Sequence, residues 1–144
     1  MYQRILVALE NSMTDEALLV EIRELAKLTN AELLLVHVAD GWVARNYERL
    51  KLAESEEMQR DREYLESTAD RLREESYRVT SRLALGDPPH EILRVAEEEQ
   101  CDLIAMTTHG HRLLGDLIHG STITHVRHRA AVPILLVRAG IRKA

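Results

Sequence analysis

Short, mainly apolar runs alternate with longer amphipathic stretches along this chain of 144 residues. Residues 3–9 and 31–38 are apolar at most positions, a pattern typical of strands that are buried on both faces of a parallel sheet. Residues 102–106 and 133–138 are two further apolar, strand-like runs, whereas residues 78–85 alternate between apolar and polar positions, as in a strand nearer the edge of a sheet. The sequence therefore predicts five strands.

Helical periodicity fills the intervals between these runs. Apolar residues recur at helical spacing from Leu18 to about Thr29, and Ser12, followed by Asp15 three positions later, is predicted to cap the start of that helix. Residues 39–53 read as a long connection. A second helix is indicated by an apolar stripe whose opposite face is charged; the stripe consists of Met58, Leu65, Ala69 and Leu72.

Two further helices complete the pattern. Asp87 suits the N-cap and Pro88 the first position of a helix, and another helix is predicted over residues 121–129. The acidic run at residues 97–99 stands unfavourably at the C-terminal end of its helix. Because strands and helices alternate, we expect one α/β domain over residues 1–144, with a parallel sheet covered by helices on both faces.

A glycine-containing loop follows the fourth predicted strand. Nine residues separate Gly110 from Gly120, and Ser121 begins a helical pattern. Glycine lets the backbone approach a ligand closely, and the first N–H groups of a helix have no partner within it. The segment lacks the motifs of a Walker A loop and of the dinucleotide fingerprint. It predicts a site for an anion such as phosphate, although a glycine turn with a helix cap has the same features.

The glycine-containing loop and the helix start that follows it, together with the strand at residues 132–138, resemble the C-terminal signature of the universal stress protein family. In nucleotide-binding members, the signature Gly-x2-Gly-x9-Gly-Ser/Thr holds the phosphates and ribose of ATP. Gly110, Gly120 and Ser121 match its spacing, and residues 35–38 resemble the end of the family's second strand. The resemblance implies the strand order 3-2-1-4-5. A ligand crevice then lies between the first and fourth strands, where the order reverses.

The chain departs from the family pattern near this crevice. At the end of the first strand, Ala8 replaces proline, Glu10 replaces aspartate and Asn11 replaces glycine. Thr107 stands where the signature has its first glycine. Glu10 keeps the charge of the family's aspartate on a longer side chain. The side chain of Thr107 is expected to crowd the ribose or the phosphates.

The resemblance implies an ATP site, with or without magnesium. Its nucleoside side would comprise Ala8, Leu9, Glu10 and Val38. Its ribose and phosphate side would comprise Thr107, His109, Gly110, His111, Gly120, Ser121 and Thr122. The family further implies a cytoplasmic regulatory module of the cellular stress response, with at most slow ATP hydrolysis and no dedicated catalytic residues.

Composition narrows the classes of function. The net charge of −5 argues against a general nucleic-acid binder, although residues 101–144 hold six Lys/Arg against two Asp/Glu, a local charge of +4 that favours an anionic ligand. No apolar run reaches the roughly 18 residues that a membrane span requires, and no signal peptide is visible. Cys101 is the only cysteine, so we expect a buried structural thiol in a reducing cytoplasm.

The histidines and the candidate nucleophiles do not complete a recognised catalytic or metal motif. His125 and His128 lie three residues apart on a predicted helix, a spacing that two metal ligands share, but no Cys or carboxylate completes the set. We therefore expect no metal. His37 ends a buried strand and is expected to be a hydrogen-bonded core residue. No nucleophile-elbow motif surrounds a serine or the cysteine, so a dedicated hydrolase is not expected.

The strand at residues 132–138 is apolar, and the implied order places it at an edge of the sheet. An exposed apolar edge is an aggregation hazard unless it is paired, and the family pairs this strand across a two-fold axis. We therefore predict a homodimer through these residues. Two other functions stay open. One is a nucleotide-free member that acts only through protein–protein interaction, which Glu10 and Thr107 favour. The other is an enzyme acting on a phosphorylated or adenylated small molecule.

Overall fold

The structure, a computed structural model, describes residues 1–39, 56–108 and 120–139. The long connection predicted after the second strand lies outside these ranges, apart from Ala39, which instead ends that strand. In chain order the elements are β1 (Arg4–Ala8), α1 (Asp15–Thr29), β2 (Glu32–Ala39), α3 (Glu56–Glu74), β3 (Val79–Leu85), α4 (Pro88–Glu98), β4 (Leu103–Thr108), α5 (Gly120–Arg129) and β5 (Ile134–Arg138).

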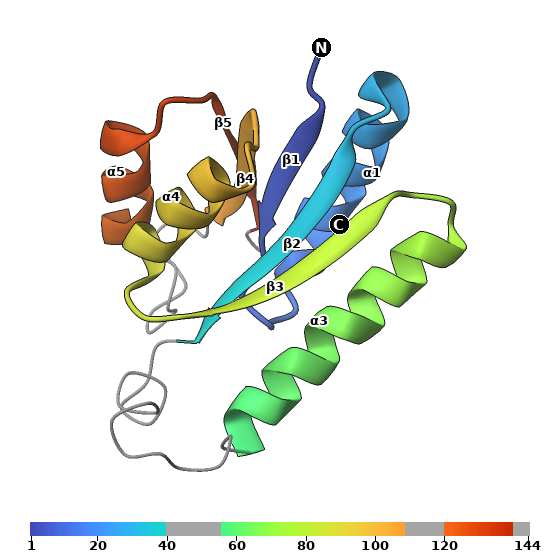
Figure 1. Cartoon of the computed structure of the whole chain (residues 1–144), viewed down its shortest axis with the longest axis horizontal. Helices are drawn as coiled ribbons and strands as arrows, with labels where there is room; N and C mark the ends of the chain where they lie inside the picture. The colour runs from blue at the N-terminus through green and yellow to red at the C-terminus, as the bar shows by residue number, and fades with distance from the viewer. Residues whose placement is uncertain (40–55, 109–119, 140–144) are drawn as a thin grey trace.

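The five strands form one parallel sheet in the order β3-β2-β1-β4-β5, which confirms the predicted fold class (Figure 1). β1 lies at the centre of the sheet, paired with β2 along its length and with β4 over residues 5–7. The chain builds outward from β1 to β3 on one side and from β4 to β5 on the other. The strand order therefore reverses between β1 and β4, which is where ligands of such sheets bind.

Helices cover both faces of the sheet, and each face has its own hydrophobic core. α1 and α3 lie on one face and α4 and α5 on the other (Figure 1). Along β1, Ile5 and Val7 pack toward α1 and α3, whereas Leu6 and Ala8 pack toward α4 and α5. Every one of these side chains is buried, so the continuous apolar run of β1 follows from the two-sided burial of a central strand.

The apolar stripe predicted for the second helix is the buried face of α3. Met58, Leu65, Ala69 and Leu72 are all at most 3% exposed. α3 is 19 residues long and is charged over its remaining surface. Throughout the part of the chain that the structure describes, no helix has both the length and the apolar character needed to cross a membrane.

The start of α1 differs from the prediction. The helix begins at Asp15, and Thr14 occupies the cap position without a side-chain cap hydrogen bond, while the Ser12 hydroxyl lies 2.6 Å from that of Thr14. Asp15 instead accepts from the backbone N–H groups of Glu10 and Asn11, each at 2.9 Å. Asn11 has a φ of 60°, and this left-handed turn brings successive N–H groups to one carboxylate. The loop is therefore held by the first residue of the helix rather than capped by Ser12.

Two predictions about the second half of the chain are confirmed. Asp87 caps α4 by accepting from the N–H of His90 at 3.4 Å, and proline occupies the first turn of the helix. Cys101 is a buried free thiol, and burial raises the pKa of this thiol to about 11. The thiol is therefore protonated and inert at neutral pH, as expected of a structural cysteine.

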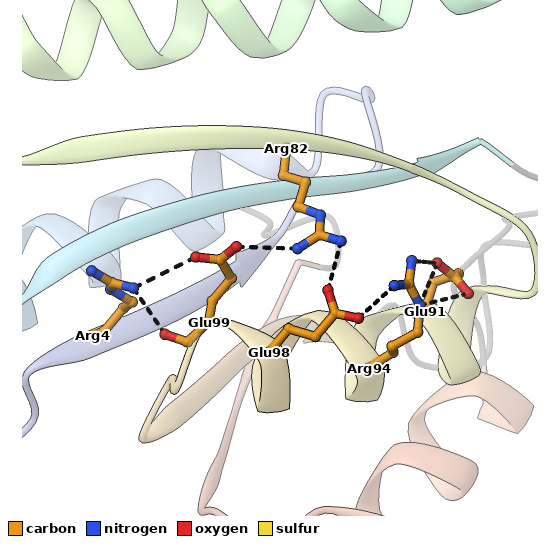
Figure 2. A network of polar contacts seen from close by, with 6 residues as sticks. All are labelled: Arg4, Arg82, Glu91, Arg94, Glu98 and Glu99. Atoms are coloured by element: carbon orange, nitrogen blue, oxygen red, sulfur yellow. Dashed lines mark hydrogen bonds and ion pairs between the residues drawn. The ribbon is translucent and has the colours of Figure 1, made fainter.

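Ion pairs compensate the acidic run at the C-terminal end of α4 (Figure 2). Glu98 lies 2.6 Å from Arg94 of the preceding turn and 2.8 Å from Arg82 of β3. Glu99 lies 3.1 Å from Arg82 and 3.6 Å from Arg4 of β1. The hydrogen bonds from Arg82 and Arg94 hold the pKa of the Glu98 carboxyl below its usual value. Cations from β1, β3 and α4 itself thus offset the unfavourable interaction between this acidic run and the helix dipole.

Replacing Arg82 with glutamine is expected to lower thermal stability at pH 7 by an amount that shrinks as the pH falls. The pKa of Glu98 is lowered in the folded state, so its contribution is present above the unfolded value of about 4.3 and is lost as the pH falls through the folded value. Melting temperatures of the wild type and Arg82→Gln, measured between pH 7 and pH 3, test this. Arg127→Gln is the control, because Arg127 is exposed on α5 and has no ion pair with any residue that the structure describes. A difference for Arg82→Gln that stays constant with pH would contradict the prediction.

Candidate functional site

A hydrogen bond bridges the predicted crevice between β1 and β4. Thr107 Oγ1, near the end of β4, donates to Glu10 Oε2, just beyond the end of β1, at 2.5 Å. Thr107 is 1% exposed and Glu10 is 9% exposed, so the bond is shielded from water. These are two of the positions at which the chain departs from the family pattern. They are 97 residues apart in sequence but act as one pair at the point where the strand order reverses.

The other predicted site residues divide into three groups. Four have buried side chains, so they would offer a ligand mainly their backbone; these are Ala8, Leu9, Val38 and Thr122. Gly120 and Ser121 are the first two residues of α5. The remaining three lie outside the described residues; these are His109, Gly110 and His111.

The start of α5 is positioned at the same edge of the sheet as Glu10 and Thr107. α5 connects the parallel neighbours β4 and β5, so it runs back along the sheet and begins near the carboxyl ends of the strands. Its first N–H groups have no partner within the helix, and the helix dipole places partial positive charge there. The arrangement suits an anionic group bound at Gly120 and Ser121.

A hollow of about 290 Å³ opens beside Glu10, on the β2 side of β1 rather than the β4 side. This volume is near the lower end of the roughly 300–1,000 Å³ that is typical of small-molecule sites. The loop after β1, the end of β2 and the first turns of α3 form its walls. Its lining residues, of which only Glu10 was predicted, are Glu10, Asn11, His37, Ala39, Glu57, Arg60 and Asp61.

A larger hollow of about 450 Å³ lies at the opposite edge of the sheet, where the strands begin. Its charged lining is already paired, because Glu32 lies 2.7 Å from Arg4 and 3.0 Å from Arg78. Ligands of doubly wound sheets bind at the carboxyl ends of the strands. We therefore place the candidate site at the crevice and the smaller hollow beside Glu10.

A buried histidine forms one wall of the smaller hollow. His37 Nδ1 lies 2.8 Å from the carbonyl oxygen of Leu9, and His37 Nε2 lies 3.3 Å from Oδ2 of Asp61 in α3. Oδ1 of Asp61 accepts from the side-chain amide of Asn11 at 2.7 Å. His37 is thus the hydrogen-bonded core residue that the sequence predicts, and it also joins the end of β1 to α3.

A second polar contact joins α3 to the loop after β1. The Tyr64 hydroxyl donates to Oδ2 of Asp15 at 2.5 Å. Burial, together with the bond to the Asp15 carboxylate, raises the pKa of the Tyr64 hydroxyl far above its usual value, so the group remains a donor at every working pH. Asp15 thus accepts hydrogen bonds from the loop and from α3 at once.

The sequence held a signal for one of the polar residues it missed. Asp61 lies three residues after Met58 and four before Leu65, so it belongs to the apolar stripe of α3. A carboxylate on a face that is otherwise buried must find partners inside the protein. Those partners, His37 and Asn11, come from β2 and the loop after β1, and no local pattern indicates them.

Comparison with known proteins gives a consistent result. The family model described as the universal stress protein family matches residues 1–138. A universal stress protein of Methanocaldococcus jannaschii is 25% identical to this chain over an alignment 155 residues long. The alignment covers 96% of this chain and 96% of the relative. A solved structure of the protein from that organism has a TM-score of 0.75 at 27% identity, with 100% of this chain and 99% of that chain covered.

Two further solved structures share the fold. A universal stress protein from Archaeoglobus fulgidus in complex with dAMP has a TM-score of 0.70 at 22% identity, covering 94% of this chain and 98% of that chain. A universal stress protein in complex with cAMP has a TM-score of 0.64 at 20% identity, covering 96% of this chain and 98% of that chain. At these identities the likeness is one of fold.

Proposed function

This chain belongs to the universal stress protein family, and we propose that it is a nucleotide-binding regulatory module of the cellular stress response whose ligand is ATP. One observation carries the proposal. At the reversal of strand order, the carboxylate of Glu10 and the start of α5 lie at the same edge of the sheet. A ribose needs hydrogen-bond acceptors and phosphates need N–H donors, and this edge offers both.

The residues at the crevice fit an adenine nucleotide in chemistry. Glu10 would accept from ribose hydroxyls, and the backbone at Gly120 and Ser121 would hold phosphate oxygens. A magnesium ion accompanying ATP would be held mainly through those oxygens, because the described residues hold no cluster of three or more His, Cys, Asp or Glu suited to a metal. The dAMP and cAMP complexes of structurally similar proteins support an adenine nucleotide as the ligand class.

The proposal is tested by analysing the nucleotide that denaturation releases from freshly purified protein. Mass spectrometry is expected to detect ATP or ADP at close to one per chain, and titration calorimetry is expected to give micromolar rebinding of ATP. The double variant Gly110→Ala/Gly120→Ala is the matched control: it should lose binding while its circular dichroism spectrum is retained. Absence of both bound nucleotide and heat of binding at millimolar ATP would overturn the proposal.

A nucleotide-free module that acts through protein contacts is the second candidate. The hydrogen bond between Thr107 and Glu10 favours it, because the bond occupies the carboxylate that would otherwise face the ribose. The calorimetric titration separates the two candidates. A folded protein that gives no heat with ATP would direct the search to protein partners.

We also propose that the chain is not a dedicated enzyme. His37 and Asp61 are spaced like an acid–base pair, but both nitrogens of the imidazole are already engaged, with the Leu9 carbonyl and with Asp61. Both ring nitrogens therefore face groups of the protein itself rather than a nucleophile. Steady turnover of a phosphorylated or adenylated small molecule would contradict this proposal.

We further propose that the protein is located in the cytoplasm. Cys101 is a free and buried thiol, which suits the reducing conditions there.

We propose that the protein is a homodimer that pairs through residues 132–138. β5 lies at an edge of the described sheet, where strands are open to pairing with another chain. Its Leu136 is a large apolar side chain that is 39% exposed.

Replacing Leu136 with glutamate is expected to convert the dimer to a monomer at micromolar concentration, because a carboxylate would be buried at the interface. Gel filtration with light scattering measures this. Leu28→Glu is the control, since Leu28 is 83% exposed on α1. A monomeric wild type would overturn the proposed dimer.

A further inference from the structure

We propose that the hollow between the C-terminal ends of α4 and α5, the α4–α5 hollow, binds a free aliphatic amino acid such as leucine. This hollow has a volume of about 390 Å³. It lies at the edge of the sheet where β4 and β5 begin, whereas the crevice beside Glu10 and Thr107 lies at the opposite edge. The site is therefore separate from the proposed nucleotide site and does not rest on the proposed function.

The floor of the α4–α5 hollow is apolar. Ala96, Cys101 and Ile104 line it, and each of them is at most 6% exposed. Leu93 and Val132, which are half-buried members of the same hydrophobic core, form apolar walls. The protonated thiol of Cys101 acts here as a small apolar group. The volume falls within the roughly 300–1,000 Å³ that is typical of small-molecule sites, so an aliphatic side chain can leave water there.

Two helix ends meet at the rim of the α4–α5 hollow. α4 ends at Glu98 and α5 ends at Arg129, and the two helices pack side by side on one face of the sheet (Figure 1). Each helix dipole places partial negative charge at its C-terminal end. The rim is therefore a favourable place for the ammonium group of a ligand.

The rim also carries two opposite charges. Glu97 of α4 and Arg129 of α5 both line the hollow, and both are exposed. Among the residues that the structure describes, neither has an ion-pair partner, whereas Glu98 and Glu99 each pair with Arg82. Glu97 is thus the member of the acidic run whose charge is not offset by a described cation. A ligand's ammonium group beside it would supply that cation.

An aliphatic amino acid matches the floor and both charges at once. Its ammonium group would donate to Glu97, its carboxylate would accept from Arg129 and from the side-chain amide of Gln100, and its side chain would cover the apolar floor. A simple carboxylic acid or a simple amine meets only one of the two charges. A segment from the interior of a protein chain has neither charge on its backbone. These differences favour a free amino acid over the other occupants of an apolar hollow.

NMR titration of the isotope-labelled full chain tests the binding. Leucine is expected to cause saturable amide shifts at Ala96, Gln100 and Val132, with a dissociation constant in the millimolar range or below and no shifts in α3. Isocaproate and isoamylamine have the side chain of leucine with only its carboxylate or only its ammonium group. Each is expected to bind roughly fivefold more weakly than leucine.

Three outcomes of this titration would overturn the proposal. The first is the absence of saturable shifts up to the solubility limit of leucine. The second is equal binding of leucine, isocaproate and isoamylamine, which would show an apolar surface without recognition of the charges. The third is the appearance of the same shifts when the protein alone is concentrated, which would show that a second copy of the chain covers the hollow.

Two charge variants test the assigned contacts. Arg129→Gln is expected to weaken leucine binding roughly threefold without weakening isoamylamine, which has no carboxylate; Glu97→Gln should weaken leucine binding to a similar extent without weakening isocaproate, which has no ammonium group. Arg127→Gln and Glu21→Gln are the matched controls, because both residues are exposed and neither lines the hollow. Equal losses for leucine and isoamylamine in Arg129→Gln would overturn the assignment. These measurements use no nucleotide, so failure of the proposed function leaves them intact.

Discussion

Replacing Asp15 with alanine is expected to lower the free energy of unfolding by about 3–5 kcal/mol, a loss that places it among the most damaging single substitutions. Asp15 is 1% exposed and accepts from the backbone of Glu10 and Asn11 at 2.9 Å and from Tyr64 at 2.5 Å. Each buried donor left without its acceptor costs roughly 1–3 kcal/mol, and the alanine side chain offers no replacement. Urea unfolding followed by circular dichroism measures the change.

Two matched variants show whether this loss comes from the buried hydrogen bonds. Glu16→Ala removes an acid from the same helical turn, but Glu16 is exposed and pairs only at the surface with Arg71, so a change within about 0.5 kcal/mol is expected. Tyr64→Phe removes a single donor from Asp15 and should cost roughly 1–2 kcal/mol. If Asp15→Ala is no more damaging than Tyr64→Phe, the loop is held by something other than the Asp15 carboxylate.

Replacing Thr107 with glycine is expected to raise the affinity for ATP about tenfold, which corresponds to about 1.4 kcal/mol. The Thr107 side chain stands at the crevice, and its hydroxyl engages Oε2 of Glu10. Removing it opens space at the end of β4 and releases that oxygen for a ribose hydroxyl. The same change should cost roughly 1 kcal/mol of stability, because glycine in a strand loses more conformational entropy on folding. Titration calorimetry with ATP gives the affinity.

The neighbouring threonine provides the control for this second substitution. Thr108 follows Thr107 in β4, and its side chain points to the opposite face of the strand. Thr108→Gly should therefore lose similar stability without a gain in affinity. Thr107→Val keeps the bulk but removes the hydroxyl, so it separates crowding from the bond to Glu10. An affinity that falls in Thr107→Gly would mean that the hydroxyl contributes to binding and does not obstruct it.

Particular residues show which parts of the fold could be predicted. β1 has almost no polar positions and is buried on both faces, and β3 alternates and lies at an edge, so the local pattern reported the burial of these two strands. It did not do so for β5, which is apolar although it lies at the other edge and its side chains are partly exposed. The cap of α4 at Asp87 was predicted because a cap is a contact within one turn. The cap of α1 was assigned to Ser12 wrongly, because Asp15 reaches back to a left-handed turn at Asn11 that the sequence does not announce.

The candidate site was only partly accessible to the same reasoning. Glu10 and Thr107 were recognised separately, as departures from a family pattern, but their hydrogen bond depends on β4 lying beside β1. The wall of the hollow was missed, because His37 and Asp61 belong to different elements and each looks like an isolated polar residue in an apolar pattern. The acidic run at Glu98 also looked unfavourable until Arg82 of β3 was placed beside it.

The sequence by itself determined the alternation of strands and helices, the faces they bury and the α/β class of the fold. These properties depend on backbone periodicity, which acts over a few neighbouring residues. Only the tertiary structure decided which polar groups meet, from the Glu10–Thr107 bond to the contact between His37 and Asp61. The physical reason is that a buried polar group must be satisfied by whichever partner the chain topology brings to it, and that partner is often dozens of residues away.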